Sequence, residues 1–175
     1  MTHYFIIPGY QGSGKNHWQS HFERSNSNFI RIEQKDWEHP NINEWADTVE
    51  KVISKYDPAE VILVGHSMGC PTIATWADKY NRKIKGALLV APADLESKDE
   101  LMDFVGLKKY PNKRLNFKSI VVASTNDPWA SFEKTQDFAK NWGSELINIG
   151  AAGHINDQSG LGTWNEGLEI LRKIG

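Results

Sequence analysis

The segment Val61-Ile62-Leu63-Val64-Gly65-His66-Ser67-Met68-Gly69 decides the fold class. Its four leading apolar residues predict a strand that is buried on both faces, as in a parallel sheet covered by helices. An apolar pattern with helical spacing follows directly. Gly-x-Ser-x-Gly alone could be an ordinary glycine-containing turn, but at a strand-to-helix junction it is typical of a nucleophile elbow. The segment therefore predicts an α/β fold in which Ser67 is a nucleophile.

Strands and helices alternate along the rest of the chain. Further apolar runs predict strands at residues 4–7, 29–32, 87–90, 120–123 and 146–149. Helical spacing occurs at residues 18–24, 42–56, 68–80, 132–142 and 161–174. This alternation predicts a three-layer α/β/α sandwich around a six-stranded parallel sheet. The sequence has no repeat or linker, so we expect one domain over residues 1–175.

One connection stands out by its length. Residues 92–118 separate two predicted strands and are rich in charge, although Leu101–Val105 could form a helical turn. Connections this long are often functional. We expect a small flap over the active site here, and no large cap domain.

Composition excludes several classes of protein. The 20 Lys and Arg residues and 22 Asp and Glu residues give a net charge of −2, without a basic track for nucleic acid. No apolar run approaches a membrane span, and the N-terminus does not resemble a signal peptide. The single cysteine, Cys70, suits a reducing compartment. We expect a cytoplasmic protein without a membrane or nucleic-acid partner.

A nucleophilic serine needs a base, and histidine has a suitable pKa. In α/β-hydrolases the order along the chain is Ser, then Asp or Glu, then His. Five of the six histidines precede Ser67, so His154 is the only candidate with the right order. It lies in a loop of small residues after the last predicted strand. We predict that His154 is the base.

The acid must orient this histidine. Asp127 directly follows the predicted strand 120–123, at the sheet edge where a carboxylate could contact His154. Asp94 is the competitor, but it opens the predicted flap. Asp157 is too close to His154 along the chain. We therefore predict Asp127 as the acid.

The loop after the first predicted strand, Pro8 to Gly14, should complete an oxyanion hole. We assign the donors to the backbone N–H groups of Met68 and Tyr10, with Gln11 as the fallback. The same loop resembles a phosphate-binding P-loop that ends in Lys15. Asn16 stands where the magnesium-binding hydroxyl should be, which disfavours nucleotide binding. We expect neither a cofactor nor a metal.

Other residues near these motifs have plain structural interpretations. His66 should point away from the serine, and Cys70 should be a buried small hydrophobe. Gln11, Trp18 and Trp129 are candidates for substrate binding. For the tryptophans, including Trp37 and Trp164, core packing is at least as good an interpretation.

The sequence resembles the small serine hydrolases related to retinoblastoma-binding protein 9, the YdeN-like group. The resemblance is carried by Pro8-Gly9-Tyr10, His17-Trp18, Gly65-His66-Ser67-Met68-Gly69, Asn126-Asp127-Pro128, Gly153-His154-Ile155-Asn156 and Ser159-Gly160-x-Gly162-x-Trp164. It implies a compact α/β-hydrolase fold that lacks the first two strands, with Ser67, Asp127 and His154 as the triad. It also implies hydrolysis of esters or amides.

Two functions follow from these observations. The first is a serine hydrolase that cleaves small esters, or amides, through an acyl-enzyme on Ser67. The second is a protein-interaction module with a vestigial hydrolase site. The presence of a serine, an acid and a base in workable positions favours the enzyme.

Overall fold

Six parallel strands form one sheet in the order β2-β1-β3-β4-β5-β6. The computed structural model describes residues 1–175, apart from the side chain of Asp99. The strands are β1 (His3–Ile7), β2 (Phe29–Arg31), β3 (Val61–His66), β4 (Gly86–Val90), β5 (Lys118–Ala123) and β6 (Glu145–Asn148). The predicted six-stranded parallel sheet is confirmed.

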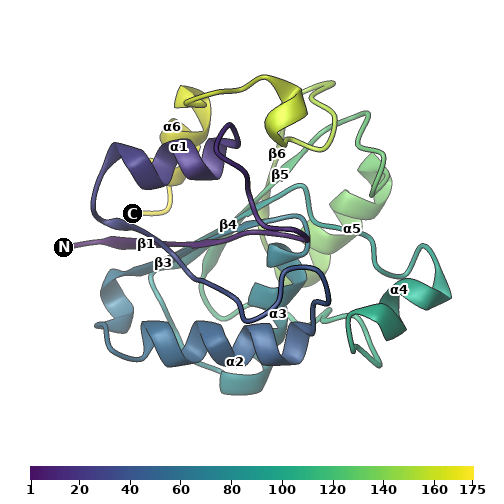
Figure 1. Ribbon diagram of the computed structural model, residues 1–175, viewed down its shortest axis with the longest axis horizontal. Coiled ribbons are helices and arrows are strands. Elements are labelled where there is room, and N and C mark those ends of the chain that lie inside the picture. Colours follow the sequence, from purple (N-terminus) through teal and green to yellow (C-terminus); the bar gives the residue numbers. More distant parts are fainter.

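Helices cover both faces of the sheet (Figure 1). One face carries α1 (Trp18–Ser25) and α6 (Asn165–Arg172), and the other carries α2 (Ile42–Ile53), α3 (Gly69–Tyr80) and α5 (Phe132–Trp142). Short 3-10 turns lie at η1 (Pro58–Glu60) and η2 (Asp157–Ser159). The predicted three-layer sandwich is therefore also confirmed.

Strand β3 lies near the middle of the sheet and connects its two cores. Every residue of β3 is buried. Ile62 and Val64 pack with α1 and α6, whereas Leu63 packs with α2, α3 and α5. Because side chains alternate between the two faces and both faces are covered, the strand is continuously apolar from Val61 to Val64. Each fully buried Val, Leu or Ile side chain contributes roughly 1.5–3 kcal/mol to folding.

Two of the predicted helices are too long. Helix α2 ends at Ile53 rather than at residue 56. Pro58 follows shortly and disfavours helical backbone at the residue before it. Helix α6 begins at Asn165 rather than at residue 161, because Gly162 and Trp164 have left-handed backbone with φ of 53° and 40°.

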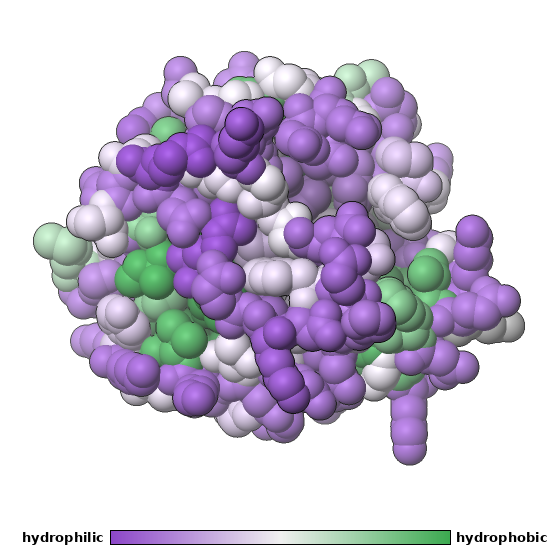
Figure 2. Space-filling view, in the orientation of Figure 1, coloured by the Kyte–Doolittle hydropathy of each residue, from purple (hydrophilic) through white to green (hydrophobic). Residues whose placement is uncertain are grey.

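The connection between β4 and β5 contains a short helix, α4 (Asp99–Phe104), close to the predicted helical turn. In Figure 1 it stands apart from the sheet, beyond α3 and α5. Figure 2 shows a largely hydrophilic face with an apolar area beside the position of α4. Within the described residues, no helix is both long and apolar enough to cross a bilayer.

Candidate active site

Ser67 occupies a strained turn between β3 and α3. Its φ of 53° lies in the left-handed region, which non-glycine residues rarely adopt. The flanking glycines make this turn possible. A Cβ on Gly69 would lie 2.1 Å from the carbonyl oxygen of Ile7, and a Cβ on Gly65 would lie 2.7 Å from Ile73 Cδ1. The strand, turn and helix thus form the geometry of a nucleophile elbow.

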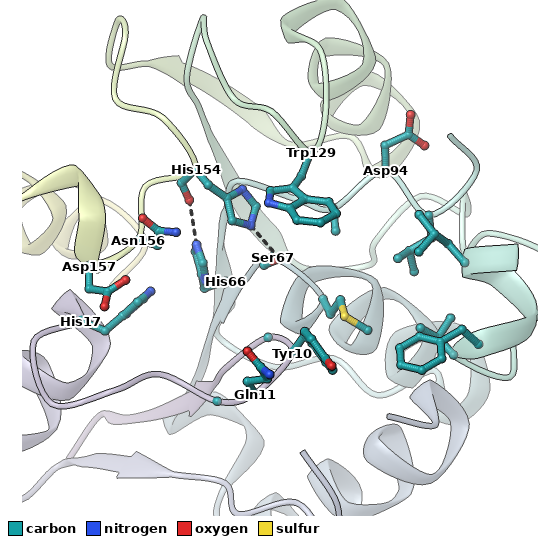
Figure 3. A pocket seen from close by; sticks show the side chains of 18 of the residues that line it. Tyr10, Gln11, His17, His66, Ser67, Asp94, Trp129, His154, Asn156 and Asp157 are labelled. Carbon is teal, nitrogen blue, oxygen red and sulfur yellow. Dashed lines mark hydrogen bonds between the residues drawn. The ribbon is translucent and has the colours of Figure 1, made fainter. Parts of the chain in front are cut away.

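A chain of hydrogen bonds joins Ser67, His154 and Asp127, as Figure 3 shows in part. The Ser67 hydroxyl lies 2.8 Å from His154 Nε2. On the other side of the ring, Nδ1 lies 2.9 Å from each carboxylate oxygen of Asp127. A carboxylate accepts, so His154 Nδ1 carries the proton and Nε2 is free to accept one from serine. The arrangement can activate the hydroxyl for nucleophilic attack.

The loop that carries His154 is held by two buried side chains. His66 Nε2 donates to the carbonyl of His154 at 2.9 Å, and Trp18 Nε1 donates to the carbonyl of Ile155 at 2.8 Å. Ile155 has a φ of 49°, so the backbone turns sharply at this point. The bonds fix the loop relative to β3 and α1. His66 thus points away from the Ser67 hydroxyl, as predicted.

Asn126 and Ser124 hold the same loop from the end of β5. The Asn126 Oδ1 accepts from the backbone N–H of Gly153 at 2.7 Å. The Ser124 hydroxyl accepts from the N–H of Ala152 at 2.9 Å. The segment that carries Asp127 is therefore tied directly to the segment that carries His154.

Two further histidines lie beside this network. The rings of His17 and His66 are 4.6 Å apart, and the rings of His66 and His154 are 4.9 Å apart. Burial lowers the pKa of His17 from 6.5 to about 4 and lowers the pKa of His66 well below its ordinary value. Both imidazoles are therefore neutral at pH 7.

Asp94, the competing candidate for the acid, and Cys70, the other potential nucleophile near the elbow, lie outside the hydrogen-bonded chain. Asp94 lies 3.8 Å from Lys134 Nζ, and its Oδ1 caps the N–H of Glu96. Cys70 is fully buried, as predicted, and burial raises the pKa of its thiol well above the usual range. A buried, protonated thiol is a poor nucleophile.

The loop after β1 passes directly over the elbow. A Cβ on Gly9 would lie 2.9 Å from Ser67 Cβ and 3.2 Å from the backbone nitrogen of Met68. The N–H of Gln11, the fallback donor, is bound to the carbonyl of Trp37 at 3.1 Å. Among the described residues, no backbone acceptor takes the N–H groups of Tyr10 and Met68. Both residues also line the cavity above Ser67.

A cavity of about 570 Å³ opens above Ser67. Of the residues predicted to bind substrate, Gln11 and Trp129 line it, and Trp129 is 57% exposed. The prediction for Trp18 is wrong, because its ring is buried in the core against Phe22 and Trp164. The segment expected to form a flap, residues 92–118, supplies the lining residues Leu95, Leu101, Phe104 and Val105, whereas sequence reasoning missed the lining residues His17, Asn156 and Asp157. For Asn156 and Asp157 a signal existed, since they lie two and three residues after His154.

The loop that resembles a P-loop lies against the turn that carries Ser67. Gly9 packs against Ser67, and the Lys15 side chain is exposed. Within the described residues, no cluster of three or more His, Cys, Asp or Glu side chains is arranged to hold a metal ion.

The sequence and the fold are similar to those of known hydrolases. A family model described as serine hydrolase matches residues 4–173. The crystal structure of a YdeN-like hydrolase from Pectobacterium atrosepticum is 34% identical, with a TM-score of 0.88 over 99% of this chain and 90% of that chain. The hydrolase YdeN of Bacillus subtilis is 23% identical over 170 residues, which cover 90% of this chain and 87% of that protein. The crystal structure of the B. subtilis ydeN product is 20% identical in the structural comparison, with a TM-score of 0.81 over 99% of this chain and 98% of that chain.

These matches confirm the predicted resemblance to YdeN-like small serine hydrolases. The family model and both YdeN-like structures extend over nearly the whole chain, including every element that carries the hydrogen-bonded network around Ser67. The chain therefore belongs to the serine hydrolase family and is similar to its YdeN-like hydrolases.

Proposed function

We propose that this protein hydrolyses small carboxylic esters through an acyl-enzyme on Ser67, with amides as a second class of substrate. The observation that carries the proposal is the hydrogen-bonded chain from Ser67 through His154 to Asp127. A Ser-His-Asp chain beneath an open cavity is the arrangement that acyl transfer requires.

In the first step, Ser67 Oγ attacks the carbonyl carbon while its proton passes to His154 Nε2. Asp127 accepts the bond from Nδ1–H and stabilises the imidazolium that forms. The negative oxygen of the tetrahedral intermediate accepts from the backbone N–H groups of Tyr10 and Met68. Such donors act where charge develops in the transition state and typically contribute 10²–10³-fold each.

In the second step, the C–O bond to the leaving alcohol breaks and His154 returns its proton to that oxygen. A water molecule then attacks the acyl carbon, with His154 again as the base. The C–O bond to Ser67 Oγ breaks, His154 passes the proton from water to Oγ, and the carboxylic acid leaves with the Ser67 hydroxyl restored. Neither step calls for a cofactor.

Labelling with a fluorophosphonate probe tests the nucleophile. The purified wild-type protein and the variants Ser67→Ala and His154→Ala are incubated with the probe, and hydrolysis of para-nitrophenyl acetate and butanoate is followed in parallel. We expect labelling and turnover of the wild type alone. Cys70→Ala is the matched control for a second nucleophile near the elbow, and it should be labelled like the wild type.

The rival function is an interaction module with a vestigial site. A wild-type protein that stays unlabelled and turns over neither ester would overturn the enzyme and favour the rival. Stabilisation by ATP in a thermal melt would instead support a nucleotide-binding loop at residues 9–15.

We also infer a cytoplasmic location, because the single cysteine forms no disulfide and is buried. Fractionation of cells that express a tagged chain tests this location. Recovery in the periplasmic or secreted fraction would contradict it.

A further inference from the structure

The cavity above Ser67 has two chemically different arms (Figure 3). The apolar arm is formed by Met68, Leu95, Leu101, Phe104 and Val105, and Asp94, which lies 3.8 Å from Lys134 Nζ, is the one charged side chain among the described residues that lines the cavity on this side. The polar arm lies on the other side of Ser67 and is formed by His17, Asn156 and Asp157. A substrate that spans Ser67 therefore meets apolar side chains at one end and polar side chains at the other.

His17 presents an unused hydrogen-bond donor to the polar arm. Its ring is 4% exposed, and its Nδ1 accepts from the backbone N–H of Gln19 at 3.1 Å, which caps α1. A neutral imidazole that accepts at Nδ1 carries its proton at Nε2. This Nε2 is buried and has no partner among the described residues. Buried donors in folded proteins nearly always have an acceptor, so this one is available to a ligand or a water molecule.

Asp157 and Asn156 add an acceptor and a second donor. The exposed Asp157 carboxylate is close enough to His17 to act on its pKa in the direction opposite to burial, and Figure 3 draws the two side chains next to each other. Asn156 Oδ1 accepts from the N–H of Gln158 at 3.1 Å, which leaves its NH2 group for the cavity. A hydroxyl group both accepts and donates, so it matches the donor of His17 and the carboxylate of Asp157 together.

The position of the base indicates which part of a substrate enters this arm. His154 must protonate the leaving oxygen, so the leaving group lies within hydrogen-bond reach of its Nε2. Asn156 and Asp157 lie two and three residues after His154, and Figure 3 shows the Asn156 side chain between His154 and Asp157. The acyl chain then extends toward Met68 and α4.

We propose that the polar arm binds a hydroxyl-bearing alcohol as the leaving group and that the apolar arm binds its acyl chain. The substrate class is an ester of an apolar acid with a hydroxylated alcohol. This assignment rests on the proposed function and deepens it, because it names the substrate of the same site.

Three esters of similar size test the assignment. Propyl butanoate has no hydroxyl group, the glycerol monoester of butanoic acid carries two on the alcohol, and the propyl ester of dihydroxybutanoic acid carries two on the acyl chain. The release of acid is followed for each, and kcat/KM is determined. We expect the wild type to prefer the glycerol monoester to propyl butanoate by about tenfold, which corresponds to one or two net hydrogen bonds.

Substitutions then assign the preference to the polar arm. His17→Asn keeps an acceptor that can cap α1 but removes the distal donor, and Asp157→Asn removes the charge of an exposed residue. Each should lower the ratio of kcat/KM between the glycerol monoester and propyl butanoate by about three- to tenfold. His21→Asn makes the same exchange one turn further along α1 and should leave the ratio unchanged. Circular dichroism establishes that each variant is folded.

Three results would overturn the assignment: equal kcat/KM values for the glycerol monoester and propyl butanoate, preference for the ester that is hydroxylated on its acyl chain, or an unchanged ratio in both polar-arm variants. The second result would mean that the arms are occupied the other way round. Failure of the proposed function looks different, since none of the three esters would be hydrolysed and the fluorophosphonate probe would not label Ser67.

Discussion

Gly9→Ala tests whether the close contact between the loop after β1 and the elbow controls the oxyanion donors. The added Cβ would lie 2.9 Å from Ser67 Cβ and 3.2 Å from both the His66 carbonyl oxygen and the Met68 nitrogen, whereas ordinary contacts begin at 3.4 Å. The loop must therefore retreat by about 0.5 Å or the elbow must yield. Either movement shifts the N–H of Tyr10 relative to the N–H of Met68.

The size of the effect follows from this displacement. Misplacement of a catalytic group by about 1 Å can cost about 10²-fold, and loss of an oxyanion donor costs about 10²–10³-fold. A shift of about half that distance should lower kcat for para-nitrophenyl acetate roughly 10- to 100-fold. KM should change much less, because the donors act mainly in the transition state. The free energy of unfolding should fall by about 1–3 kcal/mol, as for other overpacked sites.

Two controls separate this contact from a general effect of alanine. Gly14→Ala changes the same loop, but its Cβ would meet no atom within 4 Å, so kcat should stay within about twofold of the wild type. In a Ser67→Gly background the contact to Ser67 Cβ is absent, and Gly9→Ala should destabilise the protein less than it does in the wild type. A Gly9→Ala enzyme with wild-type kcat would refute the reasoning.

Three other predictions concern the titration of buried groups, the acid and the apolar arm. The pKa of His17 falls from 6.5 to about 4 on folding, because burial favours the neutral ring. The stability that depends on this neutral ring should be fully present above pH 6.5, and the free energy of unfolding should fall as the pH drops toward 4. Urea titrations across this pH range should show that the free energy of unfolding of the wild type falls by about 3 kcal/mol more than that of His17→Asn. An equal dependence on pH in the two proteins would contradict this. Asp127→Asn should lower kcat roughly 10³–10⁴-fold, as in other Ser-His-Asp triads, and a loss below tenfold would exclude Asp127 as the residue that orients His154. Leu101→Trp should fill the apolar arm and lower kcat/KM for a hexanoyl ester relative to the acetyl ester by about tenfold, and an unchanged chain-length profile would place the acyl chain elsewhere.

Most of the sheet could be predicted because its central strands are buried on both faces. Residues 61–64, 87–90 and 120–123 are continuous apolar runs, and each coincides with a strand or part of one. The edge strand β6 has exposed ends, and its predicted bounds are one residue too late. The start of α6 could not be found from periodicity, because it depends on left-handed backbone at Gly162 and Trp164.

The three hydrogen-bonded residues of the site could also be predicted from the sequence. Motif context identifies Ser67, chain order identifies His154, and the carboxyl ends of parallel strands meet at one edge, which brings Asp127 near. The polar arm was missed because its residues lie at caps and turns, where no periodic pattern gives the direction of a side chain. His17 and Trp18 are adjacent in sequence, yet one ring lines the cavity and the other is buried against α6. His17 is the N-cap of α1 and has extended backbone, with φ of −69° and ψ of 142°, so helical spacing does not predict where its ring lies.

The connection between β4 and β5 supplies much of the apolar wall, including Leu95, Leu101, Phe104 and Val105, and none of the three hydrogen-bonded residues at Ser67. Ser67, Asp127 and His154 instead come from three separate loops that are tied to one another. One continuous stretch of the sequence thus supplies most of the apolar wall, apart from the segments that carry the hydrogen-bonded residues. If the proposed function holds, insertion or deletion within that stretch changes which acyl chains fit the cavity and leaves the hydrogen-bonded residues in place.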